Sequence, residues 1–147
     1  MGLYYEDFEV GQVYKTPSRT VTEADIVIFA GLSGDYNPLH VDETYAAATP
    51  FGKRVAHGLI GLSIVTGLSA RTGLFDGTTL AMMEMNWKYV APIFPGDTVH
   101  ADMSVSSKRK TSKPGRGIIV RDIKLVNQEG KVVQEGTFTV LVKCKPE

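Results

Sequence analysis

Residues 58–71 read GLIGLSIVTGLSAR, and this stretch decides the fold of the chain. No charged side chain occurs before Arg71, and apolar side chains would fall on every side of a helix formed here. A helix that is apolar all round is a buried helix, and this one is too short for a bilayer, which takes roughly 20 residues to cross. Gly61 and Gly67 each cost about 1 kcal/mol in a helix interior, so we expect close packing against them. The stretch predicts a buried central helix.

Beyond Gly77 the chain changes to a pattern of period two, which is typical of strands. Strands are predicted at residues 81–89, 99–105, 118–126 and 132–142. Turn signals separate them at Phe94–Asp97 and Asn127–Gly130. One face of each strand is apolar and needs a cover, and only the helix at 58–71 is apolar enough to supply it. We therefore expect an α+β fold in which an antiparallel β-sheet wraps around one long central helix, the arrangement called a hot dog.

The half of the chain before this helix shows a mixed pattern. A first strand is predicted near Val13–Val21. Thr22 can cap the helix that follows, and Asp25 occupies the position of a capping-box carboxylate. We expect this helix to end at Gly31–Gly34, and a second short helix to cover Asp42–Ala48.

Length and composition indicate an ordinary globular protein. The 147 residues are expected to form a single domain, 1–147, that is large enough to bury a core. The 16 basic and 16 acidic side chains balance, so charge gives no reason to expect nucleic acid or a membrane surface as the main partner. Cys144 stands alone, which excludes an internal disulfide framework. The acidic N-terminus lacks the apolar region of a secretory signal, and a cytoplasmic protein is the simplest interpretation.

The candidate chemistry lies in the loop at residues 32–40, which reads LSGDYNPLH. Pro38 pushes Asn37 out of helical geometry, so Asp35 and His40 do not lie on one helix face. The glycine and asparagine of the loop tolerate sharp turns that can bring the two side chains to one point. Imidazole can then take a proton from water, while the carboxylate orients that water or fixes the histidine tautomer.

A purely structural interpretation of this loop stays open. Asp35 could cap Leu39 or Asn37, with His40 as a satisfied surface group. Gly58 favours the catalytic interpretation, because it begins the central helix, where backbone N–H groups are unpaired and the helix dipole favours negative charge. Charge that develops on a thioester oxygen would be stabilised there. For the neighbouring His57 we expect a capping or packing role.

The residues Ser33–His40, followed by Ala56-His57-Gly58, resemble the signature of the MaoC-like dehydratases, the (R)-specific enoyl-CoA hydratases. The resemblance extends from about Phe8 to Val142. It implies a hydro-lyase that hydrates trans-2-enoyl-CoA to (R)-3-hydroxyacyl-CoA and catalyses the reverse dehydration, without metal or cofactor. By position, Asp35 and His40 match the family's catalytic pair, and the Gly58 amide matches its thioester oxyanion donor.

The resemblance also implies supporting residues and a partner. Asn37 matches the motif asparagine, whose expected role is to shape the loop. A small hydroxyl in the helix commonly supports the aspartate in relatives; Thr66 fills that position here, and Ser63, one turn earlier, is the alternative. Longer relatives fuse two such domains, so this chain is expected to pair as a homodimer, a double hot dog, with acyl-CoA as its substrate.

Two other functions fit a hot-dog fold. A hot-dog acyl-CoA thioesterase usually relies on a carboxylate in or near the central helix, as do acyl-carrier-protein dehydratases that use a helix glutamate. Residues 58–71 contain no Asp or Glu, which argues against both. A non-catalytic acyl-binding or assembly subunit would be expected to lose Asp35 or His40, and the chain has both.

Two weaker signals remain. A basic cluster, which comprises Lys108, Arg109 and Lys110 with Lys113 and Arg116 nearby, fits either a solvated hairpin or contacts to the phosphates of CoA. Trp87 and its neighbouring methionines fit the core or a dimer interface better than an acyl-binding wall, although methionine can line a pocket for varied chains. These methionines are Met82, Met83 and Met85.

Overall fold

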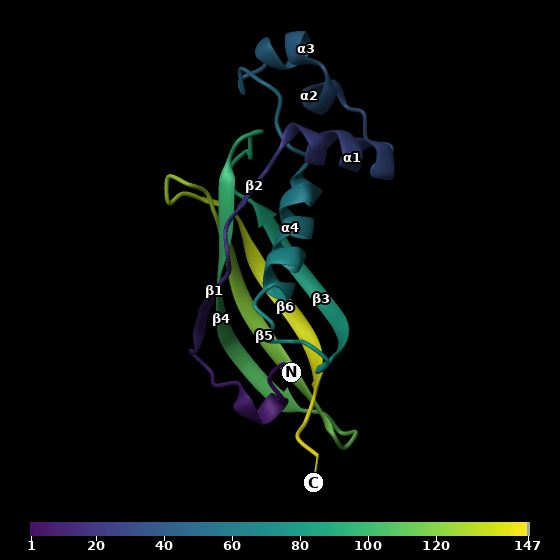
Figure 1. The fold of residues 1–147 in the computed structure, drawn as a ribbon, viewed down its shortest axis with the longest axis vertical. Coiled ribbons are helices and arrows are strands. Elements are labelled where there is room, and N and C mark those ends of the chain that lie inside the picture. The colour runs from purple at the N-terminus through teal and green to yellow at the C-terminus, as the bar shows by residue number, and fades with distance from the viewer. Residues whose placement is uncertain (147) are drawn as a thin grey trace.

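The computed structural model describes residues 1–146 (Figure 1). Its helices are η1 (Tyr5–Asp7), α1 (Glu23–Ser33), α2 (Pro38–Val41), α3 (Glu43–Ala47) and α4 (Gly58–Ala70). Its strands are β1 (Val13–Lys15), β2 (Arg19–Thr20), β3 (Thr79–Tyr89), β4 (Thr98–Lys110), β5 (Arg116–Val126) and β6 (Val132–Lys143).

The sheet is antiparallel, with the strand order β1-β4-β5-β6-β3 and β2 paired to β4. In Figure 1, α4 lies along the sheet, α1–α3 gather beyond one end, and the β4–β5 hairpin lies at the other end. The main core is formed where α4 meets the sheet, with Ile64 and Leu68 of the helix packed in one cluster with Ile123 and Phe138. The predicted hot-dog arrangement and its four long strands are confirmed.

Only one side of α4 is buried in the single chain. The prediction of a helix that is buried on every side is therefore wrong for the single chain. Leu59 is 52% exposed, and Ser63, Thr66 and Gly67 are exposed as well. The reason is geometric, because one sheet can cover only one side of a helix. Close packing at Gly61 is confirmed, since a Cβ there would lie 2.3 Å from the Gln134 side chain, whereas a Cβ at Gly67 would meet no atom within 4 Å.

The segment before the site also departs from the prediction. The expected strand at Val13–Val21 is split into β1 and β2, because Pro17 has no N–H to donate to a ladder. The capping box of Thr22 and Asp25 is confirmed, and α1 runs on to a left-handed cap at Gly34. The predicted helix at Asp42–Ala48 corresponds to α3, while α2 was not predicted.

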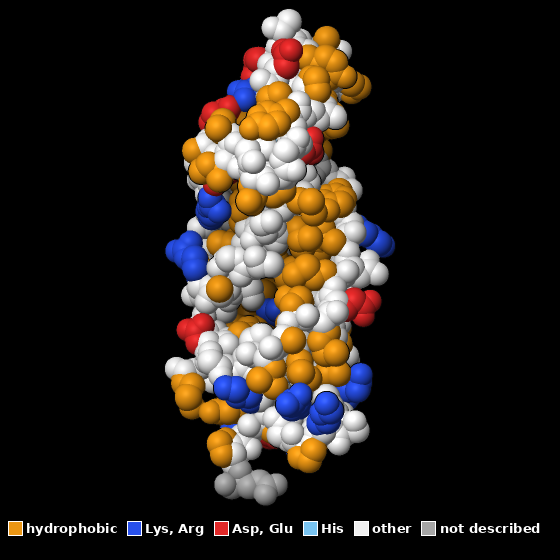
Figure 2. Space-filling view, turned by 90° about the vertical axis from the view of Figure 1, so that its right-hand side faces the viewer, with side chains coloured by type: hydrophobic (Ala, Val, Ile, Leu, Met, Phe, Trp, Pro, Cys, Tyr) orange, Lys and Arg blue, Asp and Glu red, His pale blue; other side chains and the backbone are white. Residues whose placement is uncertain are grey.

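The edge strand β3 is unusually apolar and open. It pairs with β6 alone, and Met82, Met83 and Met85 are 42%, 55% and 38% exposed. Figure 2, which faces the side on which β3 and α4 lie, shows hydrophobic side chains along much of its length. Trp87 is half-buried and packs on Phe138. Within the described residues, no helix is long and apolar enough to span a membrane.

Candidate active site

Short-range hydrogen bonds shape the loop between α1 and α2. Gly34 ends α1 with a φ of 75°, a left-handed conformation that suits glycine. Asp35 Oδ1 then accepts from the Asn37 N–H at 3.1 Å, and Asn37 Oδ1 accepts from the Leu39 N–H at 3.0 Å. Pro38 takes the first helical position, where a missing N–H costs nothing. Asn37 thus shapes the loop, as expected, and also caps α2.

His40 is oriented by the segment that leads into α4. Its Nδ1 lies 2.7 Å from the main-chain oxygen of Val55. A carbonyl oxygen only accepts, so Nδ1 carries the hydrogen and the neutral ring keeps Nε2 as its basic nitrogen. The ring is half-buried, and this tautomer is the one that a general base acting through Nε2 requires.

His57 completes a cluster with the predicted pair. Its Nε2 lies 2.8 Å from the main-chain oxygen of Asp35, and its ring stacks on that of His40 with centroids 3.9 Å apart. Phe29 covers it at 4.9 Å. His57 precedes α4 at the N-cap position but makes no side-chain cap hydrogen bond, so its role is packing and loop attachment rather than capping.

The structure therefore brings Asp35 and His40 together, although the loop alone did not require it. One side-chain donor or ligand atom from each of Asp35, His40 and His57 lies within 4.8 Å of the others. A carboxylate and two imidazoles at this spacing can hold a water molecule or a cation. One nitrogen of each imidazole already faces a main-chain oxygen, so each ring has a single nitrogen left for either task.

The N-terminus of α4 opens on a cavity of about 370 Å³ next to this cluster. Gly58, His40 and Tyr89 contribute to its wall, together with apolar residues on both sides. A Cβ at Gly58 would lie 2.8 Å from the Tyr89 ring, so any larger residue here would displace the ring or the start of the helix. Within residues 1–146 the Gly58 N–H has no hydrogen-bond partner, as expected for the first residue of a helix. The cavity thus combines a basic nitrogen with an unpaired backbone donor.

Gln134, on the inner face of β6, holds the other side of Gly58. Its Nε2 donates to the Gly58 carbonyl oxygen at 2.9 Å, and its Oε1 accepts from Trp87 Nε1 at 2.9 Å. Sequence reasoning missed Gln134. The signal that could have revealed it is a single amide among the apolar side chains of a strand, because a buried amide must find partners.

The two predicted supporting hydroxyls make other contacts in the single chain. Thr66 is exposed, and its hydroxyl donates to the main-chain oxygen of Ser63 at 2.6 Å. Ser63 lines a separate cavity of about 210 Å³ between α1 and α4. Neither side chain makes a hydrogen bond with Asp35 in the described part of the chain.

The predicted CoA contacts lie at the opposite end of the sheet and differ from one another. Lys108 is engaged within the fold, because its Nζ donates to the main-chain oxygens of Phe8 at 2.5 Å and Tyr5 at 3.3 Å. Lys110 pairs with Glu6 at 3.6 Å, and Arg109 is exposed. Of the three, only Arg109 has a charge without a described partner.

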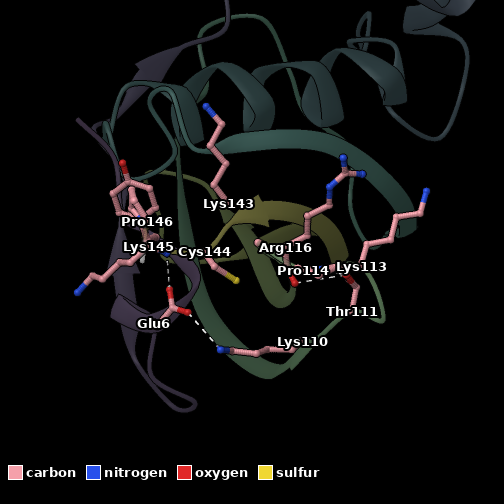
Figure 3. A pocket seen from close by; sticks show the side chains of 12 residues that line it. Glu6, Lys110, Thr111, Lys113, Pro114, Arg116, Lys143, Cys144, Lys145 and Pro146 are labelled. Atoms are coloured by element: carbon pink, nitrogen blue, oxygen red, sulfur yellow. Dashed lines mark hydrogen bonds and ion pairs between the residues drawn. The ribbon is translucent and has the colours of Figure 1, made fainter.

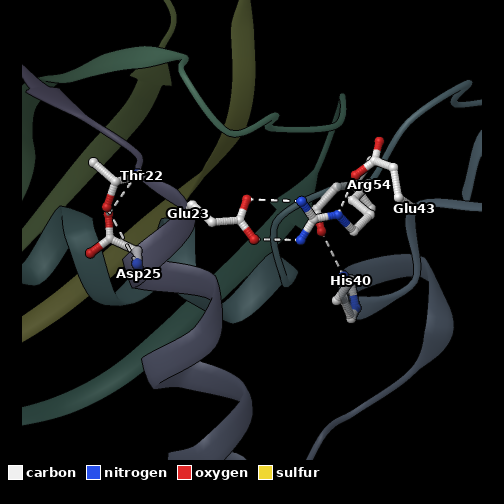
Figure 4. Close-up of polar contacts among 7 residues, drawn as sticks. Thr22, Glu23, Asp25, His40, Glu43 and Arg54 are labelled. Carbon is white, nitrogen blue, oxygen red and sulfur yellow. Dashed lines mark hydrogen bonds and ion pairs between the residues drawn. The ribbon is translucent and has the colours of Figure 1, made fainter.

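A second arrangement that sequence reasoning missed surrounds Arg54, one residue before the carbonyl that holds His40 (Figure 4). Its guanidinium bonds Glu23 of α1 at 2.5 and 3.0 Å and Glu43 of α3 at 2.5 Å. These carboxylates raise the pKa of Arg54 above its ordinary value. The network ties two helices to the segment that orients the histidine.

Comparisons with known proteins identify the family of the chain. A model of the MaoC like domain matches residues 7–126, a range that contains the loop, His57 and Gly58. The chain belongs to the MaoC-like dehydratase family. It is 34% identical over 142 residues to an (R)-specific enoyl-CoA hydratase of Rhodospirillum rubrum, covering 97% of this chain and 93% of that protein.

Two further relatives place the domain in longer proteins. Protein MaoC of Klebsiella aerogenes is 42% identical over 113 residues, covering 77% of this chain and 33% of that protein. A conserved hypothetical protein of Mycobacterium tuberculosis with a double hot-dog fold superposes with a TM-score of 0.87 at 21% identity, covering 99% of this chain and 46% of that one. The MaoC-like chain therefore has the hot-dog fold, and it corresponds to part of each of these longer proteins.

Proposed function

We propose that the protein hydrates trans-2-enoyl-CoA to (R)-3-hydroxyacyl-CoA and catalyses the reverse dehydration. The observation that carries the proposal is His40, whose Nδ1 bond to the Val55 carbonyl leaves Nε2 as a base beside Asp35. The adjoining cavity begins at the unpaired amide of Gly58. The relative from Rhodospirillum rubrum, named as an (R)-specific enoyl-CoA hydratase, supports the same reaction.

In the proposed reaction the thioester oxygen accepts a hydrogen bond from the Gly58 amide, which draws charge away from C3 of the substrate. Asp35 and His40 hold a water, and His40 removes its proton as the oxygen adds to C3. The Asp35–His40 pair, which has gained the proton of the water, returns one proton to C2 from the same face, so that one water adds across the double bond and the pair regains its starting protonation state. The charge balance is complete with the groups of the site, and the proposed reaction needs no metal or cofactor.

The proposed functional unit is a homodimer. The open β3 edge and the exposed side of α4 leave apolar surface that a second copy can cover. The double hot-dog relative, of which this chain spans 46%, supports such a pairing.

A thioesterase is the second candidate, because it would use the same fold and substrate class. The described residues weigh against it, since α4 carries no carboxylate that could activate water at the thioester carbon. The carboxylate of the site, Asp35, lies instead on the loop beside His40.

Incubation with trans-2-enoyl-CoAs of several chain lengths, followed by chiral analysis of the product, tests the proposal. We expect (R)-3-hydroxyacyl-CoA, and a loss of about 10²- to 10⁴-fold in kcat for His40→Ala and Asp35→Asn. Tyr36→Phe serves as the control, because its side chain is 61% exposed in the same loop. An (S) product, release of free CoA, or full activity of both variants would overturn the assignment.

A further inference from the structure

A basic pocket lies at the end of the sheet opposite α1–α3, between the β4–β5 hairpin, η1 and the C-terminal segment (Figure 3). Its volume is about 950 Å³, and Glu6 is its single acidic residue. The chain as a whole has no net charge, so the pocket is a local concentration of positive charge. Its cations are Lys110, Lys113, Arg116, Lys143 and Lys145.

The cations of the basic pocket are not equally available to a ligand. Carboxylates of η1 pair with Lys110 at 3.6 Å and with Lys145 at 2.5 Å. Lys113 and Arg116 make no ion pair or side-chain hydrogen bond with residues 1–146, and Lys143 bonds only a main-chain oxygen. In Figure 3 these three side chains extend away from Glu6, whereas Lys110 turns toward it. Among the described residues, no carboxylate compensates these three positive charges.

Within one chain, the basic pocket is far from the candidate active site. The site lies at the N-terminus of α4, and the basic pocket lies beyond the other end of this helix (Figure 1). The 13 residues of α4 span about 20 Å. Within one chain, the basic pocket is therefore separated from the cavity beside His40 by at least the length of α4.

The open edge of β3 changes this geometry in a dimer. A long apolar edge with unpaired backbone groups is a template for another strand. A two-fold axis beside the open edge of β3 would pair this strand with β3 of a second copy, and the two strands would run antiparallel. The start of β3 in one copy then lies beside its end in the other copy.

One end of β3 lies near the basic pocket, and the other end lies at the cavity that contains His40. Thr79 pairs with Val142, the neighbour of Lys143, and Lys143 pairs with Arg116 on the next strand. Tyr89, at the other end, lines the cavity that contains His40. Since neighbouring strands lie about 5 Å apart, Lys143 and Arg116 would lie roughly 10–15 Å from the cavity mouth of the second copy.

We propose that the basic pocket of one copy binds the phosphates of the CoA whose acyl group occupies the cavity of the other copy. Lys113, Arg116 and Lys143 supply the charge. The guanidinium can bind a phosphate with two parallel hydrogen bonds, and the ammonium groups act as point charges. The inference rests on the proposed function, because it takes a CoA thioester as substrate and a β3-paired homodimer as the active unit.

The first test separates the nucleotide from the acyl group. The triple variant Lys113→Gln/Arg116→Gln/Lys143→Gln is assayed with crotonyl-CoA and with crotonyl-pantetheine, which lacks the nucleotide and its phosphates. We expect the KM for crotonyl-CoA to rise about 10-fold or more, as for the loss of at least 1.4 kcal/mol of binding, with kcat retained. The KM for crotonyl-pantetheine should change by less than about twofold, since no phosphate contact is lost. The control Lys15→Gln/Lys124→Gln/Lys131→Gln removes equal charge outside the pocket.

The second test asks whether the pocket acts between subunits. Mixed dimers are isolated through two different tags, one on a His40→Ala copy and one on a copy with the triple substitution. The intact histidine then belongs to the copy with the altered pocket, and the intact pocket belongs to the inactive copy. We expect the low KM for crotonyl-CoA to return, with about half the kcat of the wild-type dimer because one site of two is active.

The outcomes separate this inference from the proposed function. If wild-type protein hydrates neither substrate, the proposed function fails. If hydration occurs but the triple variant keeps its KM, or shifts the KM for both substrates equally, the phosphate site is wrong. A high KM in the mixed dimer overturns the action between subunits. In a parallel assay with the crotonyl thioester of acyl-carrier protein, a rise of KM for this substrate with an unchanged KM for crotonyl-CoA would assign the pocket to an acidic carrier protein and overturn the nucleotide site.

Discussion

An arginine lies near each end of α4, and the two are held in opposite ways. Arg54, on the N-terminal side, has 21% of its side chain exposed and bonds Glu23 and Glu43. Arg121, on β5 beneath the C-terminal end, is 3% exposed and has no carboxylate partner within residues 1–146. Burial lowers the pKa of Arg121 to about 10, whereas the carboxylates raise that of Arg54.

The partners of Arg121 explain how a buried guanidinium is tolerated. Its Nη1 donates to Ser69 Oγ at 2.9 Å, and its centre lies 4.2 Å from the centroid of the Phe75 ring. Ser69 belongs to the last turn of α4, where the helix dipole is negative. The C-terminal end is thus closed by a cation, while the N-terminal end keeps an unpaired amide in a cavity. One helix provides a structural end and a candidate catalytic end.

The largest effect in this comparison is expected from a substitution at the N-terminal end of α4, the candidate catalytic end. Gly58→Ala introduces a Cβ 2.8 Å from the Tyr89 ring, which displaces the amide from its position in the cavity. Loss of one oxyanion donor costs about 10²- to 10³-fold in kcat. Steady-state kinetics with enoyl-CoA measures this effect, and unfolding in urea shows whether the fold is kept. Unchanged kcat in a folded variant would remove Gly58 from the proposed mechanism.

The structural end is tested by two substitutions at Arg121. Arg121→Ala leaves a cavity and removes a charged hydrogen bond, so we expect a loss of about 3 kcal/mol in the free energy of unfolding. Arg121→Met keeps most of the volume and removes the buried charge, and it should be near neutral or stabilising. Urea unfolding measures both variants. Equal losses for alanine and methionine would mean that the charge, rather than the packing, stabilises this end.

The two interior glycines of α4 offer a smaller contrast. A Cβ at Gly61 would collide with the Gln134 side chain at 2.3 Å, while a Cβ at Gly67 would meet open space. Gly61→Ala should therefore cost about 1–3 kcal/mol in unfolding free energy through overpacking. Gly67→Ala should stabilise the single chain by about 0.5–1 kcal/mol, because alanine loses less backbone entropy in a helix. If the two variants are equally stable in urea unfolding, the packing difference along α4 does not hold.

The fold was accessible from the sequence where a pattern is long and regular. The uncharged run of α4 and the period of two in β3–β6 predicted the central helix and the sheet correctly. The short helix α2 was not predicted, because its four residues form barely one turn and so cannot show a repeating hydrophobic pattern. The segment Val13–Val21 was predicted as one strand, because its strand pattern continues on both sides of Pro17. The structure divides it into β1 and β2.

In the candidate site, too, the contacts between residues close in sequence could be predicted, and the contacts between distant residues could not. The turn that carries Asp35 and Asn37 is formed by residues two positions apart, so the sequence indicates it. The orientation of His40 depends on Val55, and the network of Arg54 reaches 31 positions back to Glu23. Such contacts follow from the tertiary fold, and a single sequence has no local pattern that records them.

The smallest expected effect concerns Arg54, which is half-buried, whereas Arg121 is buried. The carboxylates that Arg54 binds are 52% and 64% exposed. Ion pairs that face solvent contribute about 0–1 kcal/mol, so Arg54→Met should hardly change the free energy of unfolding. Its effect should appear in kcat, with a fall of about threefold, because a less fixed Val55 carbonyl holds the His40 ring less firmly and small misplacements of catalytic groups are costly. Arg54→Lys keeps one charge but loses the two-sided contact with Glu23 and Glu43, and should recover part of the kcat. Urea unfolding and steady-state kinetics on both variants, with Arg71→Met as a matched exposed arginine, measure the two effects. A large loss of stability with unchanged kcat would make Arg54 structural, like Arg121.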